Sequence, residues 1–96
     1  MTKEEIIKKI NKSKMELSKF DVISLSLFGS YESGNPTEKS DIDFLVMFDN
    51  NTFRNFTGLK YYLENIFHKN IDLVCENSIK ESMLPFINKM VLWQKN

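Results

Sequence analysis

Hydrophobic and polar residues alternate along the 96-residue chain with two periods, one typical of helices and one typical of strands. Apolar residues recur at near-helical spacing over 3–18, and Thr2 and Glu5 form a capping box in front of them, so an amphipathic helix is predicted there. The last part of the chain shows the helical period again. A final helix is therefore predicted after a cap at Ser82, with Pro85 in its first turn.

Three segments have the pattern of strands. In 22–28 one face is apolar and the other is mixed, which suits an edge strand better than a central one. In 41–48 both faces are apolar from Phe44 onward, which indicates a central strand covered on both sides. Residues 71–75 form a short third strand.

Two helices are expected between these strands. A short one runs from Ser30 to Gly34, and a longer one begins after a cap at Asn51 or Thr52 and ends at Asn70. The element order is thus α-β-(α)-β-α-β-α. It predicts an α/β (α+β) fold in which helices pack against a small three-stranded mixed sheet.

The composition narrows the class of protein. The charges of its 13 basic and 13 acidic side chains cancel, and the net charge of zero argues against a protein that coats nucleic acid by neutralising phosphates. No apolar run approaches the ~20 residues that span a bilayer, and the N-terminal residues lack the apolar core of a signal peptide. A single cysteine fits a reducing cytoplasm. We expect one cytoplasmic domain over 1–96, with no membrane and no direct nucleic-acid partner.

Three aspartates are predicted to meet at one edge of the sheet. Asp41 and Asp43 lie two residues apart on a strand, so both side chains project to one face with Cα atoms ~6.6 Å apart. Alone, this pair has an ordinary alternative: a turn acid followed by a solvent-facing acid. The strand-helix-strand unit that follows, however, favours a parallel neighbour, which brings Asp72 beside them. Close carboxylates repel each other unless a cation is bound, so a metal site is predicted.

Gly29 and Ser30 follow the first strand and reach the same edge if that strand runs antiparallel to the central one. Glycine lets a phosphate approach the backbone, and the amides that open a short helix can donate to it. An ordinary turn is the alternative. Phosphate donors opposite carboxylate ligands point to phosphoryl or nucleotidyl transfer, and hard oxygen ligands favour Mg²⁺.

These motifs resemble a known family. Gly29-Ser30, ten further residues, Asp41-Ile-Asp43 and the acid in Ile71-Asp72-Leu-Val are similar to the nucleotidyltransferase signature of the DNA polymerase beta superfamily. The length of the chain and the local sequence around these motifs most closely resemble the minimal nucleotidyltransferases, over roughly residues 20–95. The resemblance implies the nucleotidyltransferase fold.

The resemblance also implies roles for these residues. Asp41 and Asp43 would bind two Mg²⁺ ions. Asp72 would complete one metal's coordination and help deprotonate the acceptor hydroxyl. Gly29 and Ser30 would hold the phosphates of a nucleoside triphosphate.

The resemblance further implies a partner. Minimal nucleotidyltransferases pair with HEPN-domain toxins as antitoxins, and some members transfer AMP from ATP to a tyrosine of the toxin. Two alternatives stay open: an antitoxin that acts by occlusion with a non-catalytic triad, and transfer to a small molecule such as an antibiotic. Many relatives carry arginines after the Gly-Ser, whereas here no basic residue precedes Lys39 in that stretch.

Several other residues have mainly structural interpretations. His68, the only histidine, is expected to complement the C-terminal dipole of its helix, and a catalytic role at the carboxylate edge is the alternative. Cys75 is expected to be a small buried hydrophobe. Four apolar residues of the last predicted helix are expected in the core, although an exposed stripe would indicate a partner surface: Met83, Phe86, Met90 and Trp93.

Overall fold

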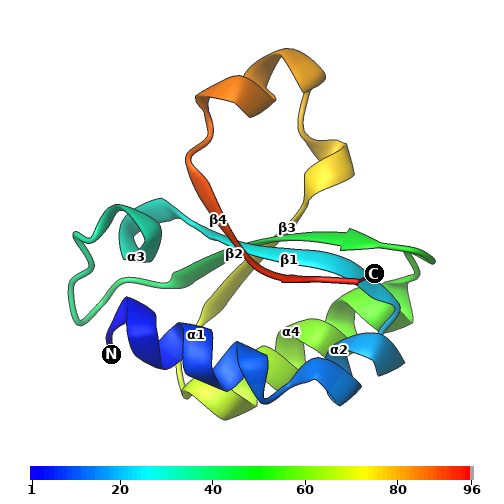
Figure 1. Cartoon of the computed structure of the whole chain (residues 1–96), viewed down its shortest axis with the longest axis horizontal. Coiled ribbons are helices and arrows are strands. Elements are labelled where there is room, and N and C mark those ends of the chain that lie inside the picture. Colours follow the sequence, from blue (N-terminus) through cyan, green and yellow to red (C-terminus); the bar gives the residue numbers. More distant parts are fainter. Residues whose placement is uncertain (96) are drawn as a thin grey trace.

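The computed structural model describes residues 1–95 as a four-stranded sheet with helices on one of its faces (Figure 1). The strands are β1 (Val22–Phe28), β2 (Ile42–Phe48), β3 (Ile71–Cys75) and β4 (Lys89–Gln94). Three helices lie beneath the sheet in Figure 1: α1 (Lys3–Asn11), α2 (Lys14–Lys19) and α4 (Phe53–Phe67). A short helix, α3 (Gly29–Ser33), lies at one end.

The strand order across the sheet is β3-β2-β1-β4. β2 and β3 are parallel, as predicted from the helical crossover between them, whereas β1 is antiparallel to both β2 and β4. The predicted α/β class and mixed sheet are confirmed. The predicted number of three strands is wrong, because the C-terminal segment forms β4.

The predicted edge position of β1 is also wrong, because β1 lies between β2 and β4. Its mixed face contains Ser26, which is only 2% exposed and pairs with Leu45 on one side and Val91 on the other. A serine hydroxyl is small enough to be buried on such a face without opening the sheet. The central position predicted for β2 is confirmed.

The helix predicted after Ser82 does not form. Instead the chain makes two 3₁₀ turns, η1 (Glu76–Ser78) and η2 (Glu81–Phe86), before it enters β4. Pro85 lacks an amide hydrogen and lies inside η2, where an α-helix would need that donor. The apolar residues from Met90 onward then pair with β1, so tertiary pairing overrides their helical spacing.

The first predicted helix is divided in two. α1 is capped by Thr2, whose side chain accepts a hydrogen bond from the Glu5 amide at 3.2 Å. The helix ends at Asn11 because buried Ser13 turns inward: its hydroxyl donates to the Lys9 carbonyl at 2.7 Å and accepts from the Tyr62 hydroxyl at 2.7 Å. This polar contact ties the break between α1 and α2 to α4.

The long helix α4 begins at its predicted cap. Thr52, rather than Asn51, accepts a hydrogen bond from the Asn55 amide at 3.0 Å. The helix ends earlier than Asn70, because His68 adopts a left-handed conformation (φ 54°) and its amide donates to the Glu64 carbonyl at 2.8 Å. The short helix α3 ends as predicted at Gly34, which is also left-handed (φ 86°).

A single hydrophobic core lies between the helices and the sheet. The apolar faces of α1, α4, β1 and β2 supply most of it, and Cys75 is partly buried at its margin. The largest fully buried side chains are Phe44, Phe67, Ile6, Ile10, Leu17, Leu25, Leu27, Ile42, Leu45, Leu59 and Leu63. Through residue 95, the helices are all too short or too polar to cross a bilayer.

Candidate active site

Asp43 and Asp72 lie side by side on the sheet face that carries no helix. The parallel pairing of β2 with β3 places Asp43 directly opposite Asp72. Both belong to the face that alternates with the buried residues Ile42 and Ile71, which point toward the helices. The predicted meeting of acids from two separate segments is therefore present for these two residues.

Asp43 is held in an unfavourable electrostatic position. Partial burial raises its pKa, and the hydrogen bond and negative charge of the neighbouring Asp72 raise it further, with a smaller contribution from the charge of Asp41. Together these causes raise the pKa of Asp43 to about 6. A bound cation would favour the ionised form of Asp43, which burial and the neighbouring carboxylates disfavour.

Asp41 lies just before β2 and is exposed, so it is not part of the strand as predicted. Its charge acts on Asp43, but within residues 1–95 no three His, Cys, Asp or Glu side chains gather closely enough to form a metal cluster. The structure thus pairs Asp43 with Asp72 and leaves Asp41 at the margin of the pair.

The donor set nevertheless fits a hard divalent cation. The aspartates offer only oxygen atoms, which Mg²⁺ prefers. Within the described residues the one ion pair is Lys89 with Glu76, so no salt bridge offsets the charge of the aspartates there. A bound Mg²⁺ ion would offset the negative charge of Asp43 and Asp72 and so reduce the repulsion between them.

Gly29 lies against Asp43. Its φ of 74° is left-handed, and a Cβ atom added to it would lie 2.8 Å from Cγ of Asp43. Only glycine combines this backbone conformation with this close approach. Gly29 and Ser30 open α3 at the end of β1, beside Asp43, because Phe28 pairs directly with Asp43. The antiparallel arrangement that the sequence interpretation required is confirmed.

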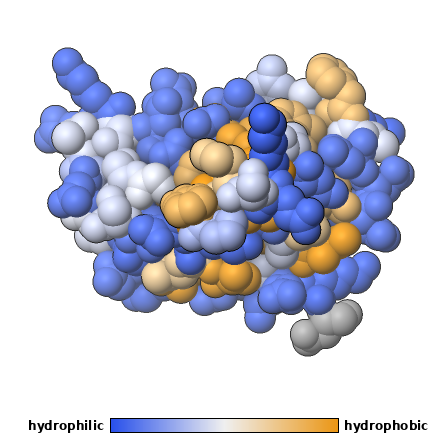
Figure 2. Space-filling model, turned by 90° about the horizontal axis from the view of Figure 1, so that it is seen from above, coloured by the Kyte–Doolittle hydropathy of each residue, from blue (hydrophilic) through white to orange (hydrophobic). Residues whose placement is uncertain are grey.

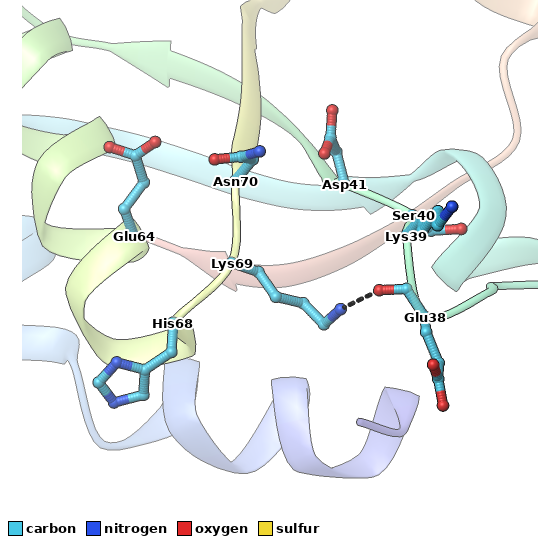
Figure 3. Close-up of a pocket in the computed structure, with 8 residues that line it drawn as sticks. All are labelled: Glu38, Lys39, Ser40, Asp41, Glu64, His68, Lys69 and Asn70. Atoms are coloured by element: carbon cyan, nitrogen blue, oxygen red, sulfur yellow. Dashed lines mark hydrogen bonds between the residues drawn. The ribbon is translucent and has the colours of Figure 1, made fainter.

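A pocket of about 630 Å³ lies beside Asp41. Its walls are the loop before β2, the end of α4 and the start of β3 (Figure 3). Its lining is mixed in charge, because Lys39 and Lys69 lie beside three acids: Glu38, Asp41 and Glu64. Lys39 is the basic residue nearest after Gly29-Ser30 in the sequence, and the fold adds Lys69 to the same pocket.

Lys69 was not recognised from the sequence. Its Nζ donates to the Glu38 carbonyl at 3.1 Å (Figure 3) and lies 6.0 Å from the centre of the Tyr31 ring. Glu38 precedes Asp41 by three residues, Lys69 precedes Asp72 by three, and Tyr31 follows Gly29 by two. Lys69 therefore ties together the three segments that carry the candidate site. A cation just ahead of the strand with the third acid is the signal that could have identified it.

Replacing Lys69 with Met is expected to weaken the contacts between these three segments. Loss of the hydrogen bond and the cation–π contact should cost about 1 kcal/mol, which lowers the melting temperature by about 4–8 °C in a domain of this size. Hydrogen exchange should accelerate over residues 30–40. Lys60→Met, on half-buried Lys60 of α4, is the control; equal effects of the two substitutions on exchange over 30–40 would contradict this role of Lys69.

His68 lies at the rim of the same pocket, but its ring points away from the Asp41 carboxylate (Figure 3). Its backbone has the clear role, because His68 ends α4 in the left-handed conformation. The structure therefore favours the structural interpretation of this residue.

Comparison with known proteins gives the family. The model of the nucleotidyltransferase domain matches residues 5–92, almost the whole chain. The chain belongs to the nucleotidyltransferase domain family. The predicted family and enzyme class are confirmed, and the paired aspartates beside a left-handed glycine lie in a nucleotidyltransferase domain.

Curated relatives cover similar lengths. A candidate protein adenylyltransferase of Methanocaldococcus jannaschii is 39% identical over 90 residues, which are 91% of this chain and 85% of the relative. The protein adenylyltransferase MntA of Thermococcus cleftensis is 34% identical over 95 residues, 97% of this chain and 96% of the relative.

Solved structures share the nucleotidyltransferase fold. A candidate minimal nucleotidyltransferase superposes with a TM-score of 0.75 at 25% identity, covering 86% of each chain. The complex of a tri-AMPylated HEPN toxin with its MNT antitoxin from Shewanella oneidensis gives a TM-score of 0.66 at 21% identity, covering 98% of this chain and 74% of the other.

Proposed function

We propose that this nucleotidyltransferase transfers AMP from ATP to the hydroxyl group of a tyrosine on a HEPN-type partner protein. By this modification it acts as an antitoxin. The observation that carries the proposal is the pairing of Asp43 with Asp72 beside Gly29. The substrates are taken from relatives named protein adenylyltransferases and from the similar antitoxin in complex with an AMPylated HEPN toxin.

The proposed reaction balances as an in-line displacement at the α-phosphorus of ATP. The acceptor oxygen forms a bond to this phosphorus, and the bond from the phosphorus to the oxygen that bridges to the β-phosphate breaks. Pyrophosphate leaves, and the hydroxyl proton passes to a carboxylate, for which Asp72 is the best placed because it is exposed beside Asp43.

Each residue has a separate part in this proposal. Asp41, Asp43 and Asp72 would hold two Mg²⁺ ions, which when bound offset the triphosphate charge and lower the pKa of the acceptor hydroxyl. Gly29 and Ser30 would hold the phosphates through the backbone beside Asp43. Lys39 and Lys69, which line the neighbouring pocket with Glu38, Asp41 and Glu64, would supply the positive charge that arginines after the Gly-Ser supply in many relatives.

The test follows the label from differently labelled ATP. The chain is incubated with its HEPN-domain partner, Mg²⁺ and ATP labelled at the α- or the γ-phosphate. AMP transfer predicts label on the partner from α-labelled ATP only, with release of one pyrophosphate per label. Mass spectrometry of the partner should locate the added AMP on tyrosine.

Other outcomes would redirect the proposal. Label from γ-labelled ATP would indicate phosphate transfer instead. Full neutralisation of the partner's toxicity without any transfer, both by the wild type and by Asp43→Asn, would show that the chain acts by occlusion. Label on a small molecule but not on the partner would contradict the protein acceptor.

A further inference from the structure

The connection between β3 and β4, residues 76–88, crosses the sheet face opposite the helices. β3 and β4 are the two edge strands, so the chain must pass over β2 and β1 to reach from one to the other. Figure 1 shows this connection rising on the side of the sheet away from α1, α2 and α4. It therefore lies on the same face as Asp43 and Asp72.

The base of the connection is fixed to the sheet. Nζ of Lys89, the first residue of β4, lies 2.6 Å from Oε1 of Glu76, the first residue of the connection. Ile79 and Leu84 line a small pocket of about 330 Å³ together with Met47 of β2. The inner side of the connection thus packs over Met47, whereas Asp72, at the opposite end of β3 from Cys75, is exposed.

The outer side of the connection is apolar and exposed. Met83 is 53% exposed and Phe86 is 81% exposed, and on the adjoining β4 Val91 is 50% exposed. Figure 2, which views the molecule from this side, shows hydrophobic side chains near the middle of the face and further ones toward its edges, with hydrophilic side chains between them. Large apolar side chains that stay exposed are typical of a protein interface.

The strand register places Val91 near the paired aspartates, and Phe86 precedes Lys89, which lies in the same row as Asp43, by three residues. One row across the open face reads Asp72, Asp43, Phe28 and Lys89, and the next row reads Val74, Leu45, Ser26 and Val91. Val91 is thus two strands and one row from Asp43, a distance of about 12 Å that about four residues of extended chain span. A polypeptide seated on this surface can present one of its side chains to Asp43.

We propose that Met83, Phe86 and Val91 form the docking surface for the acceptor polypeptide, the segment of the partner protein that carries the hydroxyl. This inference rests on the proposed function and adds the place where the partner binds. Phe86 is the anchor, because an exposed aromatic side chain has the most apolar area to bury on binding.

A second copy of this chain is the less suitable occupant. A twofold contact through the same surface brings the aspartates of the two copies toward each other, and these groups already repel one another within one copy. A foreign polypeptide that carries a hydroxyl adds no such charge.

The test uses Phe86→Ser and Met83→Ser, with Phe53→Ser as a matched control. Phe53 is 84% exposed on α4, on the helix side of the sheet, so its substitution removes a similar area elsewhere. Phe86→Ser is expected to weaken binding of the HEPN-domain partner about tenfold to a hundredfold in calorimetry without nucleotide. In the transfer assay it should raise KM for the partner by a similar factor and change kcat little. Phe53→Ser should leave both near wild type.

Each other outcome overturns the inference. Equal losses for Phe53→Ser and Phe86→Ser, or unchanged binding for Phe86→Ser, would place the partner elsewhere. A change in the self-association of the chain alone, measured by sedimentation, with unchanged partner binding would assign the surface to a second copy. If the wild type transfers no AMP, the proposed chemistry fails, whereas calorimetry still decides where the partner docks.

Discussion

Replacing Asp43 with Asn is expected to abolish AMP transfer while making the metal-free protein more stable. Asn cannot carry the negative charge that a divalent cation needs, so transfer should fall at least a thousandfold, which is about 4 kcal/mol of transition-state stabilisation. The same change removes a carboxylate whose ionised form destabilises the folded protein.

The gain in stability has a defined pH dependence. The pKa of Asp43 is raised in the fold from 3.8 to about 6, so this group's contribution to stability is complete below about pH 4 and is lost as the pH rises through 6. Without solvent screening, this pKa shift would destabilise the fold by about 3 kcal/mol. Because the group is partly exposed, screening reduces this free energy to about 1–2 kcal/mol. Asp43→Asn should therefore unfold at higher urea concentration than wild type at pH 7.5, and by much less at pH 4.

Asp49→Asn is the matched control for this prediction. Asp49 is an exposed acid just beyond the other end of β2, away from Asp72. Its substitution should leave transfer intact and change stability little at either pH. Addition of Mg²⁺ should raise the melting temperature of wild type and of Asp49→Asn, but not that of Asp43→Asn. A similar response of all three proteins to Mg²⁺ would contradict a metal site at Asp43.

Replacing Gly29 with Ala is expected to damage both the fold and the site. The left-handed backbone costs about 1–2 kcal/mol for any residue with a Cβ atom. The new methyl group must also displace Asp43, whose Cγ would lie only 2.8 Å away, so the total loss should reach about 2–4 kcal/mol. Transfer should fall steeply even in the molecules that remain folded.

Gly34→Ala separates the two causes. Gly34 is also left-handed (φ 86°), but a Cβ atom there would meet nothing within 4 Å. It should therefore show the backbone strain alone, about 1–2 kcal/mol, and near-normal transfer by the folded protein. Urea unfolding and transfer rates of both variants provide the comparison. If Gly34→Ala impairs transfer as much as Gly29→Ala, the close approach of Gly29 to Asp43 has no special role.

The residues that sequence patterns located correctly are those fixed by local rules. Thr2 and Thr52 cap their helices because their hydroxyls reach the amides three residues on, and Gly34 ends α3 because it tolerates a left-handed backbone. The pairing of Asp43 with Asp72 was predictable too, because a helical crossover imposes parallel strands. The assignments of Asp41, Ser30 and the metal ions remain predictions.

The features that sequence patterns missed depend on distant partners. The helical spacing after Ser82 gave no sign that the segment would pair with β1, and the core positions predicted for Met83 and Phe86 are wrong because both are exposed. Ser13, at the break in the first helix, accepts a hydrogen bond from the Tyr62 hydroxyl, which lies 49 positions away in the sequence. Lys69 reaches the loop before Asp41 only after α4 has folded. Of these contacts, only the one made by Lys69 had a local signal, which is the position of this cation just ahead of the strand with the third acid.

The parallel register between β2 and β3 also has a consequence for how the chain folds. Residues 43 and 72 meet only after the whole crossover has formed, and β4 adds pairs between residues more than 60 positions apart. Contacts of such long sequence separation slow folding, since loop-closure entropy is lost before they form. During synthesis, the paired aspartates cannot assemble until β3 has left the ribosome, so an incomplete chain has no site with which to bind a cation.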